Sequence, residues 1–599
     1  MLAACDQATI PVPDASWTGS LGRLVVDAGD PGNLEFVRLD GAGPEHGDMT
    51  LVSVEDGNVE QAARLETLGQ PARVESLQAR IASVAEIEAG AACWLRFEAR
   101  AVQPQVELGL ARLSVKAHRT GAEKELVLDR SIYLEPVWTS IDLAFAVPSD
   151  IEAGELEIAF AVGTQLQVVD IGGVSMRCFD QDYALERLPA TSFSYAGREP
   201  DAFWRETAEN QIERYRKGDL TIEVTDADGQ PVPDVEIHIQ MFRHAFEFGA
   251  AIDAEKLVGT GADEGLTAAY RKNLKEMFNT VAFDGALNWA AWSDADSRRA
   301  IEDGLAWVRS LDLNLHGRGL VSTEGADFPA NLADKRNDPD AVREAVDAGI
   351  TTIASDLDGT VSAWDVVDRP RENHELLELL GWDELATWFR LARAAAPDAA
   401  LALNESDILA GDRMAELATL LGNLIGDDVP IDRIGAKGQF GAQPPPIQVL
   451  SDRLDQLASF NLPLAVTGFD MATTDDQLQL DFTRDFLTLA FSHPSVEGFF
   501  FDRFWGDDET AAGVEIYHAD GTMTPIGKAY REFVLENWWT DIVALSNAEG
   551  TLTSRVFQGD YRVSARKDDL RAAATLSLGP DGATVSLELA TKDQSDRTL

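Results

Sequence analysis

Strand-like and helix-like segments alternate through the middle of the chain, and this alternation is the strongest constraint on its fold. Eight short apolar runs are separated by amphipathic stretches rich in Ala and Leu, such as 382–396 and 475–491. Eight strand–helix units in about 300 residues are the period of a (β/α)8 barrel, the TIM barrel. The predicted strands are 244–251, 280–287, 314–321, 362–368, 400–405, 432–439, 462–469 and 496–504.

Segments on both sides of the predicted barrel have the period-2 patterning of β-structure. Residues 1–180 contain alternating apolar and polar runs, separated by Gly, Pro and Asp, which is typical of a β-sandwich. Residues 181–240 are expected to hold a linker and a β-hairpin around Asp228–Gly229 that lead into a barrel at 241–540. Residues 541–599 are expected to form a short C-terminal β appendage. The predicted protein is therefore multidomain.

The charge balance limits the partners of the chain. Acidic residues number 102 and basic residues 50, which gives a formal net charge of −52. Such a surface repels nucleic acid and anionic membranes, so we expect neither as a partner. The simplest interpretation is a solvated acidic surface, and a specific acidic binding face is the alternative. No run of about 20 apolar residues is present, so no transmembrane helix is predicted.

The three cysteines bear on the location of the protein. Residues 2–5, Leu-Ala-Ala-Cys, resemble a bacterial lipobox, in which the cysteine (here Cys5) is lipidated after signal cleavage. That resemblance implies an exported protein, either periplasmic, on the cell surface or extracellular, with a lipid anchor as its membrane contact; a chance match is the alternative. Cys93 and Cys178 either pair, if the chain is exported, or are two small buried side chains.

One motif within the fourth predicted strand resembles a known family. Residues 364–370 read Trp-Asp-Val-Val-Asp-Arg-Pro, which is similar to the signature Trp-Asp-Val-Val-Asn-Glu-Pro of glycoside hydrolase family 10, the retaining xylanases. Further landmarks of the family lie at 244–249, 403–404, 491–494 and 504–505, and the resemblance covers about 200–540. It implies a polysaccharide as the partner. The N-terminal sandwich resembles, more loosely, the jelly-roll carbohydrate-binding modules found beside such barrels; a purely structural sandwich is the alternative.

The chain departs from this family at both catalytic positions. The acid/base Glu of the family corresponds to Arg369, and the nucleophilic Glu corresponds to Gly468. Retaining hydrolysis needs two carboxyl groups about 5 Å apart. Arginine stays protonated near neutral pH and glycine has no side chain, so the resemblance implies that ordinary xylanase activity is lost.

Other positions of the family's active site are also substituted, and four of the substitutions are basic: Arg318, Arg369, Lys437 and Arg503. Because they come from four strands, we expect them to meet at the barrel mouth and bind an anionic group, such as a uronate carboxylate or a sulfate ester. The alternative is a closed salt-bridge network with neighbouring aspartates. The full set of predicted ligand-binding residues is Asp284, Asn288, Trp289, Arg318, Arg369, Lys437, Gln439, Asp502, Arg503 and Trp505.

Three functions remain open from the sequence. The first is a glycan-binding pseudoenzyme for acidic polysaccharide. The second is a glycan-active enzyme with a rebuilt site that uses Asp368, Glu405 or Asp470, although Asp368 is expected to point away from Arg369 along the strand. The third is a structural protein without a ligand. No cofactor and no metal are expected, because the sequence has no phosphate-binding loop, nucleophile elbow or zinc motif in a usable place.

Overall fold

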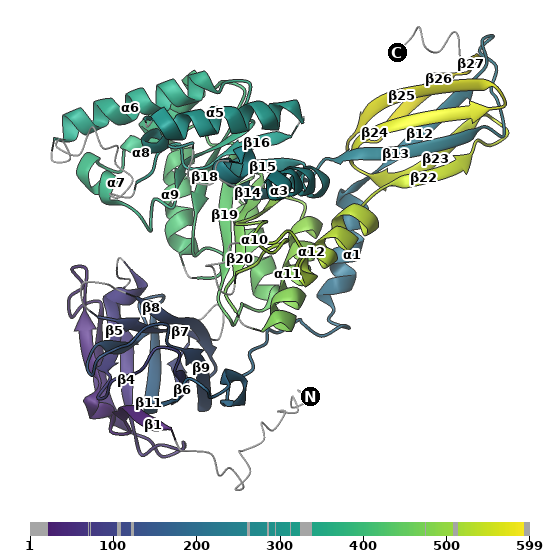
Figure 1. The fold of residues 1–599 in the computed structure, drawn as a ribbon. Coiled ribbons are helices and arrows are strands. Elements are labelled where there is room, and N and C mark those ends of the chain that lie inside the picture. The colour runs from purple at the N-terminus through teal and green to yellow at the C-terminus, as the bar shows by residue number, and fades with distance from the viewer. Residues whose placement is uncertain are drawn as a thin grey trace. The chain divides into compact units, whose positions relative to one another are not determined.

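The computed structural model describes residues 22–69, 71, 73–104, 110–120, 125–259, 264–283, 287–293, 295–311, 313–323, 338–411, 413–473, 475–506 and 513–591. The chain divides into two compact units, Met1–Ser192 and Phe193–Leu599, which are described separately below (Figure 1). In the described part of the chain, none of the helices is long and apolar enough to cross a membrane.

The N-terminal unit is a β-sandwich of two antiparallel sheets, as the sequence predicts. In β6, Leu95 and Phe97 point into the core while Arg96 lies between them on the outer face. One sheet has the order β3 (Gly47–Ser53), β4 (Gln61–Thr67), β11 (Gln167–Phe179), β6 (Ala92–Gln103) and β9 (Thr139–Ala146), with β1 (Arg23–Ala28) paired to β11. The other has the order β2 (Glu35–Arg38), β5 (Leu77–Ala82), β10 (Leu156–Ala161), β7 (Ala111–Arg119) and β8 (Leu126–Leu134), and the short 3-10 helices η1 (Pro31–Asn33), η2 (Val74–Ser76) and η3 (Leu185–Arg187) lie in connections.

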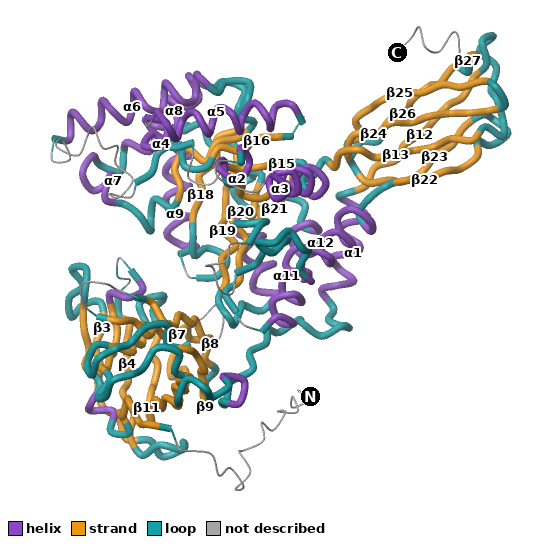
Figure 2. Tube along the Cα trace, in the orientation of Figure 1, coloured by secondary structure: helices purple, strands orange, loops and turns teal. Residues whose placement is uncertain are grey.

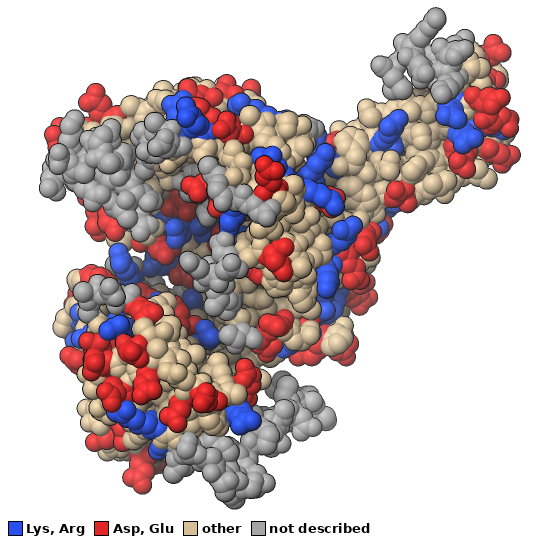
Figure 3. Space-filling view, viewed as in Figure 1, with Lys and Arg blue, Asp and Glu red and all other residues tan. Residues whose placement is uncertain are grey.

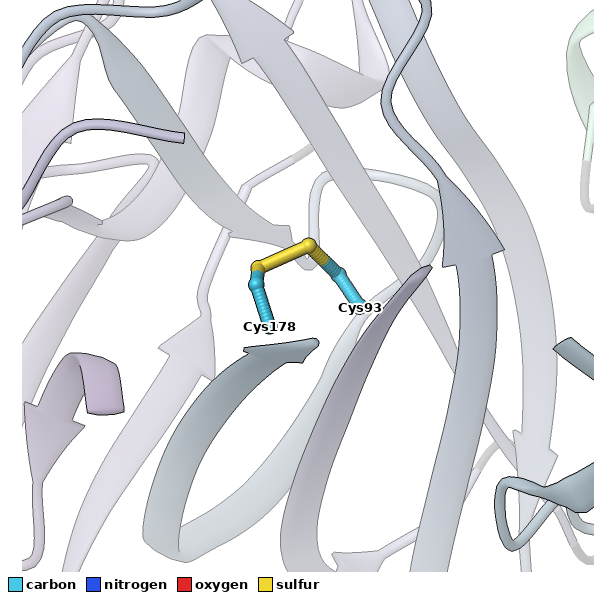
Figure 4. The surroundings of a disulfide bond; sticks show 2 residues. All are labelled: Cys93 and Cys178. Carbon is cyan, nitrogen blue, oxygen red and sulfur yellow. A yellow bond between two sulfur atoms is a disulfide. The ribbon is translucent and has the colours of Figure 1, made fainter. Parts of the chain in front are cut away.

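A disulfide joins the two cysteines of this sandwich. Cys93 of β6 and Cys178 of β11 face each other in the antiparallel register, with their Cα atoms 4.0 Å apart (Figure 4). Of the two interpretations left open by the sequence, pairing is therefore the one found in the structure. The bond links strands that are 85 residues apart in the chain.

The second unit is built around a closed barrel of eight parallel strands, with helices on its outside (Figure 2). Each of the eight predicted strands is present. The barrel strands are β14 (Glu247–Ile252), β15 (Thr280–Phe283), β16 (Asn314–Gly317), β17 (Ala363–Asp368), β18 (Ala400–Glu405), β19 (Arg433–Phe440), β20 (Leu464–Met471) and β21 (Val496–Phe501). The helices are α2 (Ala254–Val258), α3 (Glu264–Met277), α4 (Trp289–Ser293), α5 (Ala295–Ser310), α6 (Pro339–Asp356), α7 (Glu375–Leu380), α8 (Glu384–Ala395), α9 (Met414–Gly426), α10 (Ile447–Ala458), α11 (Asp476–Ser492), α12 (Pro525–Arg531) and the π-helix η6 (Glu532–Asn537).

Segments from before and after the barrel form one further β-domain within this unit. Figure 1 shows β12 (Lys217–Thr225) and β13 (Glu236–His244) lying among the C-terminal strands. One sheet has the order β23 (Thr551–Phe557), β12 and β26 (Ala583–Glu588). The other has the order β22 (Asp541–Leu545), β13, β24 (Gly559–Lys567), β25 (Leu570–Leu578) and β27 (Ala590–Thr591). The hairpin and the appendage expected from the sequence thus share one core, which the local pattern of either segment did not reveal.

Arg216 connects this β-domain to the barrel. It follows α1 (Trp204–Tyr215) and directly precedes β12. Its guanidinium donates hydrogen bonds to the backbone carbonyls of Phe491 (2.5 Å), His493 (2.6 Å) and Val496 (2.6 Å), which lead from α11 into β21. Burial lowers the pKa of Arg216 to about 10, so the group remains a cation at neutral pH. A charged donor that satisfies three carbonyls fixes the entry to the barrel.

We expect Arg216→Met to destabilise the second unit by about 3 kcal/mol or more, because three inward-facing carbonyls lose a charged donor. Differential scanning calorimetry of the whole chain measures this as a lower transition temperature for that unit. The neighbouring exposed Arg214 provides the matched control, and Arg214→Met should change stability by less than about 0.5 kcal/mol. Equal effects of the two substitutions would contradict the assigned role of Arg216.

Candidate functional site

An ion pair lies at the mouth of the barrel, at the C-terminal ends of the strands. Arg318, just after β16, contacts Asp502, just after β21, with Nη1 3.3 Å from Oδ1. Arg318 is only 8% exposed, and its Nη2 is buried without a hydrogen-bond partner among the described residues. One donor of this guanidinium is therefore buried without an acceptor among the described residues.

Gly468 of β20 borders the same ion pair. Its backbone has φ of +58°, a left-handed conformation that favours glycine. A Cβ atom at this position would lie 2.9 Å from Asp502 Oδ1 and 3.7 Å from Arg318 Nη2. The Arg318–Asp502 pair thus occupies the space toward which a side chain at position 468 would project.

A second charged cluster surrounds Asp368 at the end of β17. Asp368 Oδ2 is 3.2 Å from both Lys437 Nζ and Arg369 Nε. Arg369 also lies 3.6 Å from Glu372. Asp368 and Arg369 were expected to point to opposite sides of a strand, but they contact each other because β17 ends at Asp368 and Arg369 adopts φ of +54°. The extended alternation no longer applies after that turn.

A buried polar layer supports these clusters. Asn404 of β18 donates hydrogen bonds to Asp365 Oδ2 (3.2 Å) and Asp368 Oδ1 (2.8 Å), and its own oxygen accepts one from Thr467 (2.7 Å). The other oxygen of Asp365 lies 3.1 Å from His316 Nε2. Asn404 and Asp365 are fully buried. No role was predicted from the sequence for the fully buried members of this layer, although each lies in or near a predicted strand.

Glu405 lies below the surface of the mouth and is fully buried. Its two carboxyl oxygens accept hydrogen bonds from the backbone N–H groups of Arg371 and Ser406, each 3.0 Å long. Burial nevertheless raises the pKa of Glu405 from its ordinary value near 4.5 to about 8. The side chain is therefore protonated at neutral pH and has no contact with solvent.

Asp470 and Arg503 form a looser pair beside a small cavity. Arg503 Nη2 is 3.8 Å from Asp470 Oδ2, and Asp470 Oδ1 accepts a hydrogen bond from Val514 N at 2.6 Å. Burial raises the pKa of Asp470. The cavity has a volume of about 100 Å³, and its polar and aromatic lining comes from Asp253, Lys256, Tyr270, Asp502, Arg503 and Trp505.

The remaining predicted residues lie around the mouth with other contacts. Asn288 accepts a hydrogen bond from Ala291 N at 2.8 Å in the first turn of α4. Trp289 is 4% exposed and packs beside Gly349 of α6. Trp505 is 7% exposed and stacks on Tyr517 with ring centroids 5.5 Å apart. Both rings offer little surface to a sugar. Gln439 is exposed, while Asp284 and Cys5 lie outside the described residues.

Each of the four predicted cations thus has a carboxylate near it. This arrangement contains the salt-bridge network that the sequence left open as an alternative, through Asp368, Asp470 and Asp502. The network does not use every donor, because Nη2 of Arg318 stays without a partner among the described residues. Neutralised cations with a remaining donor can still bind an oxyanion.

A closed parallel barrel with its charged side chains at the carboxyl ends of the strands defines a TIM-barrel protein of the kind that binds or transforms ligands at that face. Residues 239–510 match the model of Glycosyl hydrolase family 10, and the barrel is a family 10-like domain.

Proteins similar to this chain include one named as an anti-sigma factor and others named as xylanases. The chain is 25% identical over 365 residues to "Anti-sigma-I factor RsgI6" of Acetivibrio thermocellus, a match that covers 60% of this chain and 46% of that protein. It is 24% identical over 310 residues to "Endo-1,4-beta-xylanase 5-like" of Arabidopsis thaliana, which covers 49% and 52%. The chain thus spans about half the length of these relatives. Xylanase 10B from Thermotoga petrophila in complex with xylobiose aligns with a TM-score of 0.44 and 17% identity, over 49% of this chain and 95% of that one.

We expect Gly468→Ala to destabilise the second unit by about 1–2 kcal/mol, because an L side chain at a left-handed backbone position is strained. The added Cβ would also lie close to Asp502. Gly422, an exposed helical glycine where an added Cβ would have nothing within 4 Å, supplies the control. Gly422→Ala should stabilise by about 0.5–1 kcal/mol. Denaturant unfolding measures both values, and two substitutions with the same sign would contradict the strain at Gly468.

We expect the stability of the wild type, relative to Glu405→Gln, to fall as the pH rises from about 4.5 to about 8. The folded state holds the Glu405 proton over this range while the unfolded state releases it, so unfolding becomes more favourable as pH rises. The difference reaches at most about 5 kcal/mol, because one pKa unit corresponds to about 1.4 kcal/mol. Unfolding curves between pH 4 and 9 measure it. The slope is the informative quantity, because Gln also loses one backbone hydrogen bond at every pH. A pH-independent difference would contradict the raised pKa.

Proposed function

We propose that this protein recognises an acidic polysaccharide at the barrel mouth and does not hydrolyse xylan. The observation that carries the proposal is the environment of Gly468, where the buried guanidinium of Arg318 borders the space that a nucleophilic carboxyl would need. The position of the acid/base group is held by Arg369, which contacts Asp368. Two cations at these positions favour binding of an anion over proton transfer.

The barrel mouth supports an anionic ligand through one specific donor. Nη2 of Arg318 is buried and unpaired among the described residues, and a buried donor without an acceptor costs free energy until a ligand supplies one. A carboxylate or sulfate oxygen is the acceptor that suits a guanidinium best. The neighbouring cavity of about 100 Å³ is large enough for a substituent of a sugar and not for a whole chain. The polysaccharide would therefore lie across the mouth with a charged group inserted.

Other features support an exported polysaccharide-binding protein. Several relatives are named as endo-1,4-beta-xylanases, so a polysaccharide ligand is the natural extension to this chain. The Cys93–Cys178 disulfide is typical of proteins in oxidising compartments. Export of the protein, with lipidation at Cys5, agrees with the presence of this disulfide. Asp and Glu are spread over the visible surface of both units with Lys and Arg among them (Figure 3), and acidic residues outnumber basic ones in the chain, so a basic ligand-binding centre differs in charge from the chain as a whole.

A glycan-active enzyme with a rebuilt site is the second candidate, and Asp470 is the residue that favours it. Its raised pKa and its position beside the cavity are properties of a proton carrier. Glu405 is less suited because it is fully buried. Asp368 is less suited because Asn404, Lys437 and Arg369 already contact both of its carboxyl oxygens. Asp470→Asn would abolish any cleavage that the wild type shows.

The test uses two substitutions with opposite expected effects on the binding of polygalacturonate and dextran sulfate by the full chain. Arg318→Met should weaken binding about tenfold or more, because a charged hydrogen bond contributes about 1.5–3 kcal/mol. Asp502→Asn should leave binding unchanged or strengthen it, because Arg318 then loses the carboxylate that competes with the ligand. Isothermal titration calorimetry gives both constants, and a reducing-end assay detects cleavage.

A matched control is Arg390→Met, which removes an exposed cation from α8 on the outside of the barrel. It should not change binding. Binding of neutral xylan in preference to both anionic polymers would contradict the proposal. Unchanged affinity in both the Arg318 and Asp502 variants would favour a closed structural network, and release of new reducing ends would favour the rebuilt enzyme.

A further inference from the structure

Three arginines lie together on the outer face of the five-stranded sheet of the C-terminal β-domain. Arg566 of β24 and Arg571 of β25 are directly opposite each other in the antiparallel register. Arg562 lies four residues before Arg566 on the same face of β24, a separation of about 13 Å along an extended strand. All three are exposed. We call Arg562, Arg566 and Arg571 the basic stripe.

The basic stripe has no ion-pair partner among the residues that the structure describes. None of its three side chains forms an ion pair or a hydrogen bond with a described residue. Glu236 faces Arg566 from β13 without forming an ion pair, and Gln240 faces Arg562. Arg555, an exposed arginine in the same domain, is paired instead and lies 3.1 Å from Glu213. The three arginines of the stripe thus form a local basic patch in a chain with 102 acidic residues.

The stripe also has a cost for folding. Like charges directly opposite each other on neighbouring strands destabilise a sheet. The other acidic groups on this face are already engaged, since Asp541 contacts His238 at 2.6 Å and Asp560 contacts Arg243 at 2.8 Å. An external anion that bridged Arg566 and Arg571 would remove the repulsion. The guanidinium fork suits a carboxylate or a sulfate ester in that position.

We propose that the basic stripe is a second polysaccharide-binding surface, separate from the barrel mouth, that takes an extended polyanionic glycan along β24. The argument for a glycan is local charge complementarity, because the opposed guanidinium groups of Arg566 and Arg571 suit the carboxylate or sulfate groups that such a polymer carries along its length. Ser564 lies between Arg562 and Arg566 on the same face, and Thr575 lies opposite Arg562; both hydroxyl groups offer hydrogen bonds to sugar hydroxyls. The ligand class is that of the proposed function, but the stripe depends on different residues.

The experiment compares two triple substitutions in the full chain. Arg562→Gln, Arg566→Gln and Arg571→Gln together remove the stripe. Lys272→Gln, Arg309→Gln and Arg390→Gln remove three exposed cations from α3, α5 and α8 and change the net charge equally. Affinity electrophoresis in polygalacturonate, dextran sulfate and neutral dextran gives the dissociation constants. The stripe variant should bind the two polyanions about fivefold or more weakly, with a shallower dependence on salt, since exposed ion pairs contribute modestly and are screened.

The outcomes of this experiment distinguish binding at the basic stripe from binding at the barrel mouth. Loss of affinity in the stripe variant, with the control triple unchanged, supports the stripe whatever Arg318→Met does. Equal affinities for the stripe variant and the wild type overturn the stripe and leave the barrel mouth untouched. No binding of either polyanion by the wild type overturns both proposals. Sedimentation velocity at low salt tests the alternative occupant. If the wild type forms a dimer and the stripe variant does not, the stripe binds a second copy of the chain and not a glycan.

Discussion

The arrangement of the barrel mouth depends on the side-chain amide of Asn404. It is fully buried, and it contacts Asp365 and Asp368 of β17 and Thr467 of β20. A buried amide must satisfy both its donors and its acceptor, so these contacts fix the position of each partner. Asp368 is the partner that reaches the mouth, and it in turn places Lys437 and Arg369. The charged surface is thus held by hydrogen bonds one layer below it.

Charge alone does not decide what the mouth binds. Asp368, Asp470 and Asp502 lie near the cations and partly cancel their charge. What distinguishes a binding site from a closed network is an unused donor in a place that a ligand can reach. Nη2 of Arg318 meets the first condition among the described residues, and Asp502, its ion-pair partner, lines the cavity of about 100 Å³ in which the proposed charged group would lie. The same reasoning applies to the basic stripe, where the arginines are not paired within the described protein.

The sequence predicts the barrel well because each of its strands is a separate apolar run whose period is visible locally. It predicts the C-terminal β-domain poorly, because β12 pairs with β23 and β26, which are more than three hundred residues away in the chain. The contacts between side chains at the barrel mouth were also not predicted from the sequence. The contact between Asp368 and Arg369 depends on one left-handed residue, which alternation along a strand cannot anticipate. Burial of Trp289 and Trp505 depends on packing against α6 and Tyr517, so their residue type alone did not decide between stacking on sugar and packing in the core.

The charged groups of the mouth lie outside the core of the scaffold. The barrel strands are stabilised by apolar packing and by the buried polar layer, neither of which uses residue 369 or 468 as a partner in the core. Exchanging a carboxyl for a guanidinium at such a position reverses the local charge while the strands keep their register. Because the supporting layer is rigid, the new cations are held in place before any ligand arrives. A fixed cation is poorly suited to proton transfer but well suited to an oxyanion. Recognition of an acidic glycan therefore requires no change of the fold, only of the groups that the fold presents.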